Sequence, residues 1–448
     1  MKLNYKRTFL VGLAFLSICA FWQLYDNVIP LVLTNTFHLN ETFSGAIMAA
    51  DNILALFLLP FFGSLSDKKE TKIGKRMPFI LLGTGLAVIL MNILPILDNS
   101  YYAQPNTFKM ISFVIVLGLL LIAMGIYRSP AVALMPDVTP KPLRSKANAI
   151  INLMGAVGGI IYLGVAALLY PNSKVAGLSH VNYQVLFIVV ASIMFISVAL
   201  LFIFIKEPRL VEENKALEVE HPEWNLAEDD GSGNETLPSD VKRSLGFLLA
   251  SIALWFIGYN AVTTWFTTYV SVVMGQGLGG ASTCLLVATA GAIVSYIPIG
   301  NIASKIGRKK TIMAGIILLA TMFFLGFVLT SIYKSINVIM FICFALVGLA
   351  WAAINVNSLP MVVEMCKGSD IGKFTGYYYT ASMAAQIVTP IFAGTLMRLI
   401  SYKVLFIYAA VFVLLSFVTM TQVKHGDQKI EVRKGLEAFV DAYEDMAD

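Results

Sequence analysis

The chain has 448 residues, of which 58% are hydrophobic and only 13% are charged. Because soluble proteins carry about a quarter charged residues, this composition excludes a protein whose only solvent is water. The net charge of +5 would suggest acidic partners in a soluble protein. Here the distribution of charge matters more than its sum, and no nucleic acid is expected to bind. No GxxxxGK[ST] loop is present, which argues against direct ATP hydrolysis.

Twelve apolar runs are each long enough to cross a bilayer, which takes roughly 20 helical residues. In chain order they are 8–33, 43–62, 79–97, 108–132, 147–170, 181–205, 244–270, 282–302, 311–332, 336–356, 374–397 and 402–420. The predicted fold is therefore an all-α membrane protein with twelve transmembrane helices. We interpret the first run as a span and not as a cleaved signal, because it is long and carries Gln23, Asp26 and Asn27.

Residues that usually hold metals are scattered along the chain. The four histidines, His38, His180, His221 and His425, fall in predicted loops or tails, and the four cysteines lie far apart. We therefore expect no cofactor, no metal site and no disulfide framework. No nucleophile, base and orienting group occur together, so we do not expect an enzyme.

The positions of the basic residues predict the orientation of the spans. Lysine and arginine in short loops favour the cytoplasmic side of a membrane. If the segments between spans are assigned alternately to the two sides, the side that includes both termini holds 26 of the 32 Lys and Arg. We therefore expect a multi-pass protein of the cell (plasma) membrane whose N- and C-termini are both cytoplasmic.

An internal repeat divides the chain into two halves. The loop GSLSDKKETKIGKR (63–76) recurs in a shorter form as GNIASKIGRKK (300–310), and each copy follows a span. Because the second copy begins at Gly300 and the first at Gly63, each half of the chain carries one copy. This spacing predicts two pseudo-symmetric six-helix bundles in parallel orientation. The predicted boundaries are an N-terminal bundle over 1–205, a flexible cytoplasmic linker over 206–243, a C-terminal bundle over 244–424 and a cytoplasmic tail over 425–448.

The first copy of the repeated loop carries a family signature. Gly63, Asp67, Gly74, Lys75 and Arg76 match the loop between spans 2 and 3 of the major facilitator superfamily, which the whole chain resembles. The stretches GKRMPFI (74–80), YRSPAVALMPD (127–137) and RSKANAI (144–150) look most like the sucrose-transporter and glycoside-pentoside-hexuronide symporter branches. The resemblance implies two bundles that rock about a site at the membrane midplane.

Two acids fall inside predicted spans, where ionisable side chains are costly and therefore candidates for function. Asp26 and Asp51 each lie about 10 Å below the outer surface, from the rise per residue of a helix, so they can share one aqueous cavity. Burial and mutual repulsion favour the protonated form of such carboxyl groups. We predict proton coupling at one of them. The alternative is that either one only forms a hydrogen bond between helices.

Polar and aromatic side chains inside other spans predict a sugar-binding site, because sugars present flat apolar faces and a ring of hydroxyls. The candidates are Trp22, Gln23, Asn52, Arg128, Asn148, Asn152, Tyr259, Asn260, Thr263, Trp351, Asn355, Tyr378 and Gln386. For each member the alternative is core packing or a satisfied contact between helices. Arg128 has two more alternatives, which are pairing with a cytoplasmic-side acid and snorkelling to the inner interface.

Charged residues at the inner ends of the spans predict a conformational latch. The candidates are Gly63, Asp67, Gly74, Arg76, Asp137, Arg144 and Glu364. Asp67 is expected to pair with Arg76, and Asp137 and Glu364 are expected to pair with the basic residues that follow them, Arg144 and Lys373. Such pairs bias a protein between two conformations. The alternatives are ordinary surface ion pairs and a solvated basic loop.

These observations favour a secondary active transporter that takes up a small-molecule substrate, a sugar or glycoside, with a proton or a sodium ion as the coupling ion. Its other expected partner is the lipid bilayer. One alternative is a facilitator-type importer or exporter of a drug, a nucleoside or a lipid-like solute. Another is a sensor of sugar that has kept the fold but does not transport.

Overall fold

A computed structural model describes residues 3–175, 177–221, 238–365 and 371–427. Twelve helices in these ranges are long and apolar enough to cross a membrane. The described residues contain no strand. The predicted all-α membrane fold with twelve transmembrane helices is therefore confirmed.

The first six spans form the N-half. They are α1 (Tyr5–Leu31), which continues as a π-helical turn η1 (Val32–Thr36), α2 (Glu41–Lys68), α3 (Met77–Ala103), α4 (Thr107–Asp137), α5 (Arg144–Leu169) and α7 (Gln184–Phe204). Two short elements, η2 (Lys141–Leu143) and α6 (Asn172–Val175), lie before and after α5. The third span is longer than the predicted 79–97, and this places Asp98 inside the helix.

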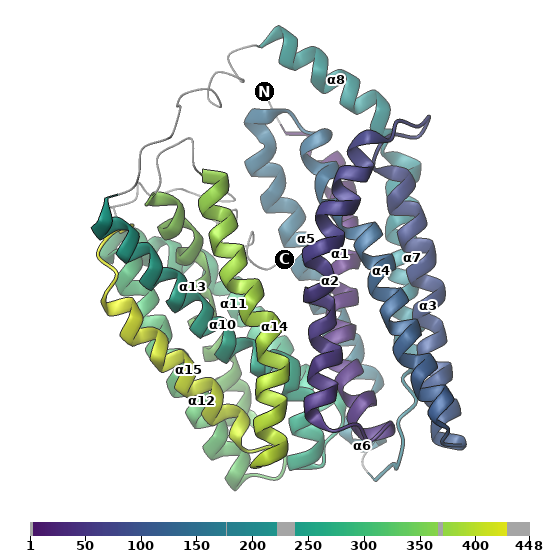
Figure 1. Cartoon of the computed structure of the whole chain (residues 1–448), viewed down its shortest axis with the longest axis vertical. Helices are drawn as coiled ribbons and strands as arrows, with labels where there is room; N and C mark the ends of the chain where they lie inside the picture. Colours follow the sequence, from purple (N-terminus) through teal and green to yellow (C-terminus); the bar gives the residue numbers. More distant parts are fainter. Residues whose placement is uncertain (1–2, 176, 222–237, 366–370, 428–448) are drawn as a thin grey trace.

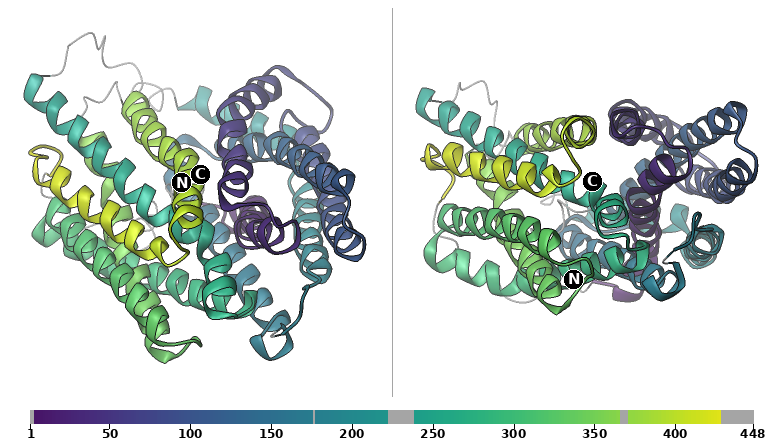
Figure 2. Two further views of the ribbon diagram at one scale, coloured as in Figure 1. Left: turned by 60° about the horizontal axis from the view of Figure 1, so that its bottom comes forward. Right: turned by 90° about the horizontal axis from the view of Figure 1, so that it is seen from below.

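The last six spans form the C-half. They are α10 (Ser239–Met274), α11 (Leu278–Ile306), α12 (Arg308–Ile332), α13 (Val338–Glu364), α14 (Ile371–Leu399) and α15 (Val404–Thr421). Each half has its own main hydrophobic core, and Leu278 of α11 packs into that of the N-half. The halves lie side by side in every view (Figures 1 and 2). We call the side at which the chain begins the terminal side, and the opposite side, where α6 lies (Figure 1), the far side.

Asparagine side chains begin four of the spans. The side-chain oxygens of Asn4, Asn40, Asn106 and Asn337 accept hydrogen bonds from backbone N–H groups in the first turns of α1, α2, α4 and α13. The first four N–H groups of a helix have no partner within it, and an asparagine cap satisfies one of them at a gain of about 1 kcal/mol. These caps help to fix the residue at which each of the four helices begins.

The segment between the halves contains a helix that the predicted flexible linker did not include. Helix α8 (Glu207–Glu220) lies on the terminal side (Figure 1). Its sequence, EPRLVEENKALEVE, is rich in strong helix formers and has proline in the first turn, where proline is tolerated. The rest of the predicted linker up to 237, and the tail beyond 427, lie outside the described residues.

Hydrogen bonds join the two halves on the far side. Asn35 of η1 donates to the Ser271 hydroxyl of α10 at 3.1 Å. The Tyr402 hydroxyl, just before α15, donates to the Glu41 carboxylate of α2 at 2.6 Å. The Gly279 N–H donates to the carbonyl oxygen of Tyr170 at 3.1 Å. The halves are therefore closed against each other at this end.

Glycine allows the halves to approach backbone to backbone on the far side. A Cβ atom on Gly45 of α2 would collide with the backbone of Pro390 in α14. A Cβ atom on Gly394 of α14 would collide in turn with the carbonyl group of Glu41. Helices approach this closely in membranes only where small residues line the contact.

Candidate functional site

A polar cavity of about 200 Å³ lies between the two halves. It is lined by residues of α1, α2 and α4 from the N-half and of α10 and α14 from the C-half. These residues are Cys19, Trp22, Gln23, Asp26, Met48, Asp51, Asn52, Ala55, Arg128, Asn260, Thr263, Thr264, Gln386 and Pro390. The cavity therefore brings together both predicted coupling acids and seven of the predicted substrate-binding residues.

Helical spacing explains why these residues face one cavity. The α1 residues 19, 22, 23 and 26 and the α2 residues 48, 51, 52 and 55 both follow the spacing i, i+3, i+4, i+7. This spacing places side chains on one face of a helix. The two faces meet across the cavity, opposite a third polar face of α10 formed by 260, 263 and 264.

The charged groups of the cavity all come from the N-half. Asp26 and Asp51 are half-buried, and the Asn52 side-chain amide donates to Asp51 Oδ1 at 2.9 Å. The guanidinium carbon of Arg128 lies 5.8 Å from the centre of the Trp22 ring, within the range of a cation–π contact. Two carboxyl groups and one guanidinium therefore share a confined polar space.

Two lining residues present buried donors without a partner. Among the described residues, neither Trp22 Nε1 nor Asn260 Nδ2 has a hydrogen-bond partner. Gln23, in contrast, is held in place, because its backbone and side-chain oxygens both accept from the Asn27 amide at 2.7 and 3.2 Å. Buried polar groups are normally hydrogen-bonded, so the two unpaired donors indicate a place for a ligand with acceptor oxygens.

Six of the predicted substrate-binding residues do not line this cavity. They are Asn148, Asn152, Tyr259, Trp351, Asn355 and Tyr378. Tyr259 and Trp351 stack on each other, with ring centres 3.7 Å apart and planes 6° apart. Tyr378 is 1% exposed, and its hydroxyl shares a hydrogen bond with Ser358 at 3.2 Å. These three side chains therefore contact other residues of the protein, whereas the sequence analysis expected them to contact a sugar.

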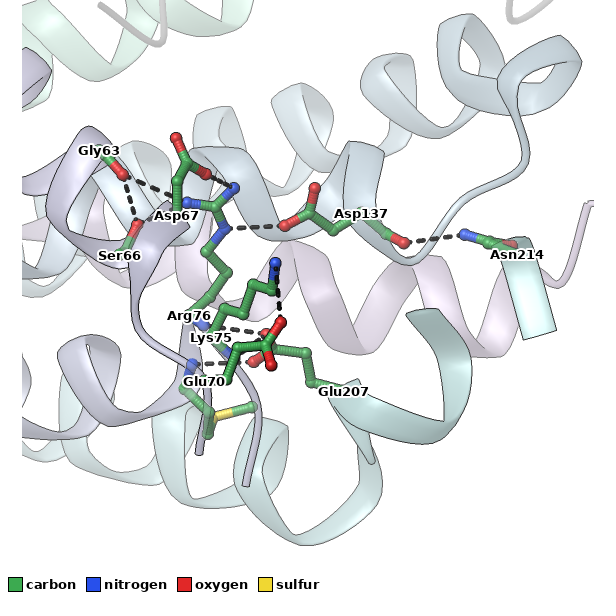
Figure 3. A network of polar contacts seen from close by, with 10 residues as sticks. Gly63, Ser66, Asp67, Glu70, Lys75, Arg76, Asp137, Glu207 and Asn214 are labelled. Carbon is green, nitrogen blue, oxygen red and sulfur yellow. Dashed lines mark hydrogen bonds and ion pairs between the residues drawn. The ribbon is translucent and has the colours of Figure 1, made fainter. Parts of the chain in front are cut away.

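Arg76 is the centre of a polar network on the terminal side of the N-half (Figure 3). Its guanidinium pairs with Asp67 of α2, donates to Asp137 Oδ2 of α4 at 2.7 Å and donates to the Ser66 hydroxyl at 2.5 Å. Its side chain is 8% exposed. Burial opposes the charge, but the carboxylates of Asp137 and Asp67 outweigh it and raise the pKa of Arg76. The network therefore holds Arg76 as a buried cation.

Glu207 of α8 belongs to the same region, and the sequence analysis missed it. Its carboxylate accepts from the backbone N–H groups of Lys75, Arg76 and Met77 at 2.6, 2.9 and 2.9 Å (Figure 3). It thus caps the N-terminus of α3, where the helix dipole favours an anion. Gly74 has φ +116°, and a Cβ atom there would collide with the Glu207 carboxylate. The available signal was the pair Glu207 and Pro208, because proline is favoured in the first turn of a helix.

Three of the predicted latch residues have partners other than those expected. Asp137 contacts Arg76, while Arg144 lies 3.6 Å from Glu218 of α8. Glu364 of α13 contacts Arg308 at 2.5 Å. The physical reason is the position of the two acids. Asp137 and Glu364 each end the fourth span of a half, beside the start of its third span. The arginine at that start is therefore close to the acid. Arg76 and Arg308 belong to the two copies of the repeated loop, and these pairs are its structural counterpart.

Two six-helix halves, each with its own main core, and a polar cavity between them define a class of membrane transporters in which the halves move about a central site. The chain belongs to the major facilitator superfamily, whose family model matches residues 11–296 and 277–436. The resemblance inferred from the repeated loop is confirmed. The protein is a transporter and not an enzyme.

One curated relative matches part of the chain. The sucrose transport protein SUC3 of Arabidopsis thaliana is 32% identical over 144 residues, a match that spans 30% of this chain and 24% of the relative. The chain thus matches about a quarter of the length of this curated relative.

Solved structures of similar fold include two transporters and a homologue of a third. A bacterial homologue of the iron transporter ferroportin, solved in an inward-facing state, has a TM-score of 0.69 at 13% identity, covering 94% of this chain and 99% of its own. A D-xylose-proton symporter has 0.68 at 14%, covering 95% and 99%. The nucleoside transporter NupG has 0.67 at 14%, covering 93% and 99%. At these identities the likeness concerns the fold alone.

Proposed function

We propose that the protein is a secondary active transporter that takes up a sugar or glycoside together with a proton. The observation that carries the proposal is the composition of the central cavity. Asp26, Asp51 and Arg128 share it with two unpaired donors, Trp22 Nε1 and Asn260 Nδ2. The acids provide a place for the proton, and the donors provide partners for hydroxyl oxygens. The partial match to a sucrose transport protein supports the substrate class.

The size of the cavity favours a small solute. Pockets for drug-sized ligands begin at roughly 300 Å³, whereas this cavity measures about 200 Å³. A monosaccharide or a small glycoside therefore fits the proposal better than a bulky drug. Polar groups on both walls also disfavour a lipid-like solute, because each buried polar group then loses its hydrogen bonds to water without replacement.

The proposed direction, uptake, assumes an orientation in the plasma membrane. The basic loops on the terminal side support an orientation with that side in the cytoplasm. The far side, where the halves are joined by Asn35–Ser271 and Glu41–Tyr402, is then the outer side. In this proposal the described state is inward-facing, and Asp67, Arg76 and Asp137 form the latch of the N-half.

The coupling is tested by uptake into liposomes that hold the purified protein. We expect a pH gradient, acid outside, to drive uptake of a sugar by the unchanged protein. Asp26→Asn or Asp51→Asn should abolish gradient-driven uptake while exchange of labelled sugar persists. Glu212→Gln is the matched control, because Glu212 is exposed on α8. If both cavity variants respond to the gradient like the unchanged protein, the coupling proposal is wrong.

The substrate is tested by a thermal-shift screen over mono- and disaccharides at two pH values. We expect a stabilising sugar whose effect is larger at the lower pH, since the protonated cavity binds it better. A sugar that stabilises but is never taken up would indicate a sensor. A screen in which only nucleosides or drugs stabilise would replace the sugar with that class.

A further inference from the structure

A further buried acid, Asp98, lies at the far-side end of α3 and does not line the central cavity. Asp98 is 0% exposed, and neither of its carboxylate oxygens has a hydrogen-bond partner at standard distances among the described residues; the Thr36 hydroxyl is its nearby polar neighbour. The side chain that faces it as a possible cation is His180, whose Nε2 atom lies 3.8 Å from Asp98 Oδ2. A buried carboxylate with so few donors is costly, so this pair requires an explanation.

His180 is held in a fixed orientation beside Asp98. Its ring stacks on Tyr102, with centres 4.3 Å apart and planes 11° apart. Its Nε2 atom is 2.8 Å from Asn99 Oδ1, and its Nδ1 atom is 3.5 Å from the Thr36 hydroxyl. Both ring nitrogens thus face oxygens that can accept, which suits a doubly protonated ring. Burial lowers the pKa of His180 and so disfavours the charged ring. The neighbouring oxygens favour it.

The pair is connected to the contact between the halves. Thr36, which His180 touches, is the last residue of the π-helical turn η1. The preceding residue, Asn35, donates to Ser271 of the C-half at 3.1 Å. Single π-helical turns within α-helices are rare and are often found at functional sites. A change at His180 therefore acts, through one turn of irregular helix, on a hydrogen bond that closes the far side.

A polar cavity gives the pair access to protons from water. It measures about 250 Å³, and its lining includes Asn35, Thr36, His180, Ser271 and Gln276 from both halves. The side chain of His180 is 12% exposed, whereas that of Asp98 is 1% exposed. His180 therefore stands between the buried carboxylate and the cavity.

Tyrosine and lysine side chains also lie on the elements around the pair. Burial and the neighbouring Asp98 raise the pKa of Tyr183 above its usual range, so its phenol stays neutral. The ring of Tyr102 lies against that of His180. On α4, the Lys109 ammonium donates to the carbonyl oxygens of Ser100 and Gln104 at 2.8 and 3.0 Å. Lys174 of α6 is exposed. On the α10–α11 side of the cavity, Gln276 is neutral.

We propose that Asp98 and His180 form a second proton-binding site, separate from the central acids, and that a proton bound there stabilises the closed contact between the halves on the far side. With one shared proton the pair is electrically neutral. Without it, a net negative charge is buried, and its desolvation is costly. Separation of the two side chains with entry of water relieves this cost. That movement displaces Thr36 and Asn35 and weakens the Asn35–Ser271 hydrogen bond.

The test measures far-side opening with the central acids removed. Spin labels at Gln104→Cys and Ser335→Cys, both exposed far-side positions on opposite halves, report the distance between the halves in a background without native cysteines and with Asp26→Asn and Asp51→Asn. We expect the distance distribution to shift to longer values as the pH rises from 5.5 to 8.5. Asp98→Asn, which removes the titrating charge, should leave the closed distance at every pH. His180→Gln should move the midpoint by at least about one pH unit.

A matched control separates the pair from histidines in general. His38 is an exposed far-side loop residue with φ 52°, a conformation that asparagine tolerates. His38→Asn should keep the pH response of the parent protein. The proposal is overturned if the parent with neutralised central acids shows no pH response, or if His180→Gln responds with the parent's midpoint. Should Asp98→Asn fail to fold, His180→Gln decides alone.

The coupling proposal and this one fail separately. Loss of gradient-driven uptake in the central variants concerns Asp26 and Asp51 only. The distance measurement is made without transport and without those two carboxyl groups, so it reports the far-side pair whether or not a proton drives uptake.

Discussion

Trp22 shows how one atom of the central cavity can be tested. Its indole N–H is buried and has no partner among the described residues, while its ring contacts Arg128. Trp22→Phe keeps an aromatic ring and removes the donor. We expect sugar affinity to fall by about 1 to 2 kcal/mol, roughly 5- to 30-fold, with the melting temperature nearly unchanged. Binding of the sugar identified by the screen, measured by calorimetry, checks this.

The control for this change is Trp351→Phe. Trp351 is also an indole inside a span, but it stacks on Tyr259 and does not line the cavity. We expect its replacement to lower thermal stability and to leave affinity within about twofold. Equal losses of affinity in both variants would show that the unpaired donor of Trp22 has no special part in binding.

At the residue scale the sequence predicted the acids better than the aromatic residues. A charged residue inside a span has few tolerable positions, so Asp26 and Asp51 had to face a polar space, and they face the same one. An aromatic residue is equally stable against another aromatic residue, as Tyr259 is against Trp351. Helical spacing cannot separate these outcomes, since it gives the face of a helix and not the neighbour. Asp98 was missed because the predicted span ended one residue before it.

At the scale of single elements, α8 joins the linker to the N-half. Besides the Glu207 cap of α3, Asn214 of α8 donates to the backbone oxygen of Asp137 at 2.9 Å, and Glu218 lies 3.6 Å from Arg144 (Figure 3 shows the first two). Helix α8 is therefore an extension of the N-half on the terminal side, attached to three of its loops or helix ends.

Glu207→Gln tests the cap. Glutamine keeps the shape of the side chain but lacks its charge and places an N–H₂ group where an oxygen accepted. Because Glu207 is 2% exposed and accepts three backbone N–H groups, we expect a loss of about 1 to 3 kcal/mol in the free energy of unfolding. The melting temperature of the purified protein measures it. Glu212→Gln, on the exposed face of the same helix, should change it little; similar losses in both would contradict the cap.

The sequence predicted the spans reliably and the linker helix not at all. A span is a long apolar run that must satisfy its own backbone in lipid, so its presence follows from composition. The existence of α8 depends on contacts with Gly74, Arg76 and Asp137, which are distant in the chain. Polar residues with helical propensity suit both a flexible linker and a packed helix, and only those contacts decide between them.

At the scale of the whole molecule, a substitution at the close contact between α2 and α14 should change how often the far side is closed. Gly45→Ala adds a methyl group where a Cβ atom collides with the Pro390 backbone. Overpacking of this kind costs about 1 to 3 kcal/mol, and the cost applies only while the far side is closed. We expect the Gln104–Ser335 label distance to shift to longer values at constant pH.

Gly118→Ala is the control for this shift, because a Cβ atom on Gly118 meets nothing within 4 Å. It should leave the distance distribution unchanged. An unchanged distribution in Gly45→Ala as well would mean that the helices relax locally, and that the glycine contact does not decide which state is populated.

The charged network around Arg76 has a mechanical consequence. Its members, Ser66, Asp67, Asp137 and Glu207, all belong to the N-half or to α8, so in this state none of these bonds crosses to the other half. The network therefore stiffens one bundle and does not fasten two bundles together. In this state the latch proposed for Asp67, Arg76 and Asp137 therefore acts by stabilising the N-half alone, and Arg76 is too buried for salt to screen it strongly. The contact between α2 and α14 on the far side depends on glycine and not on charge.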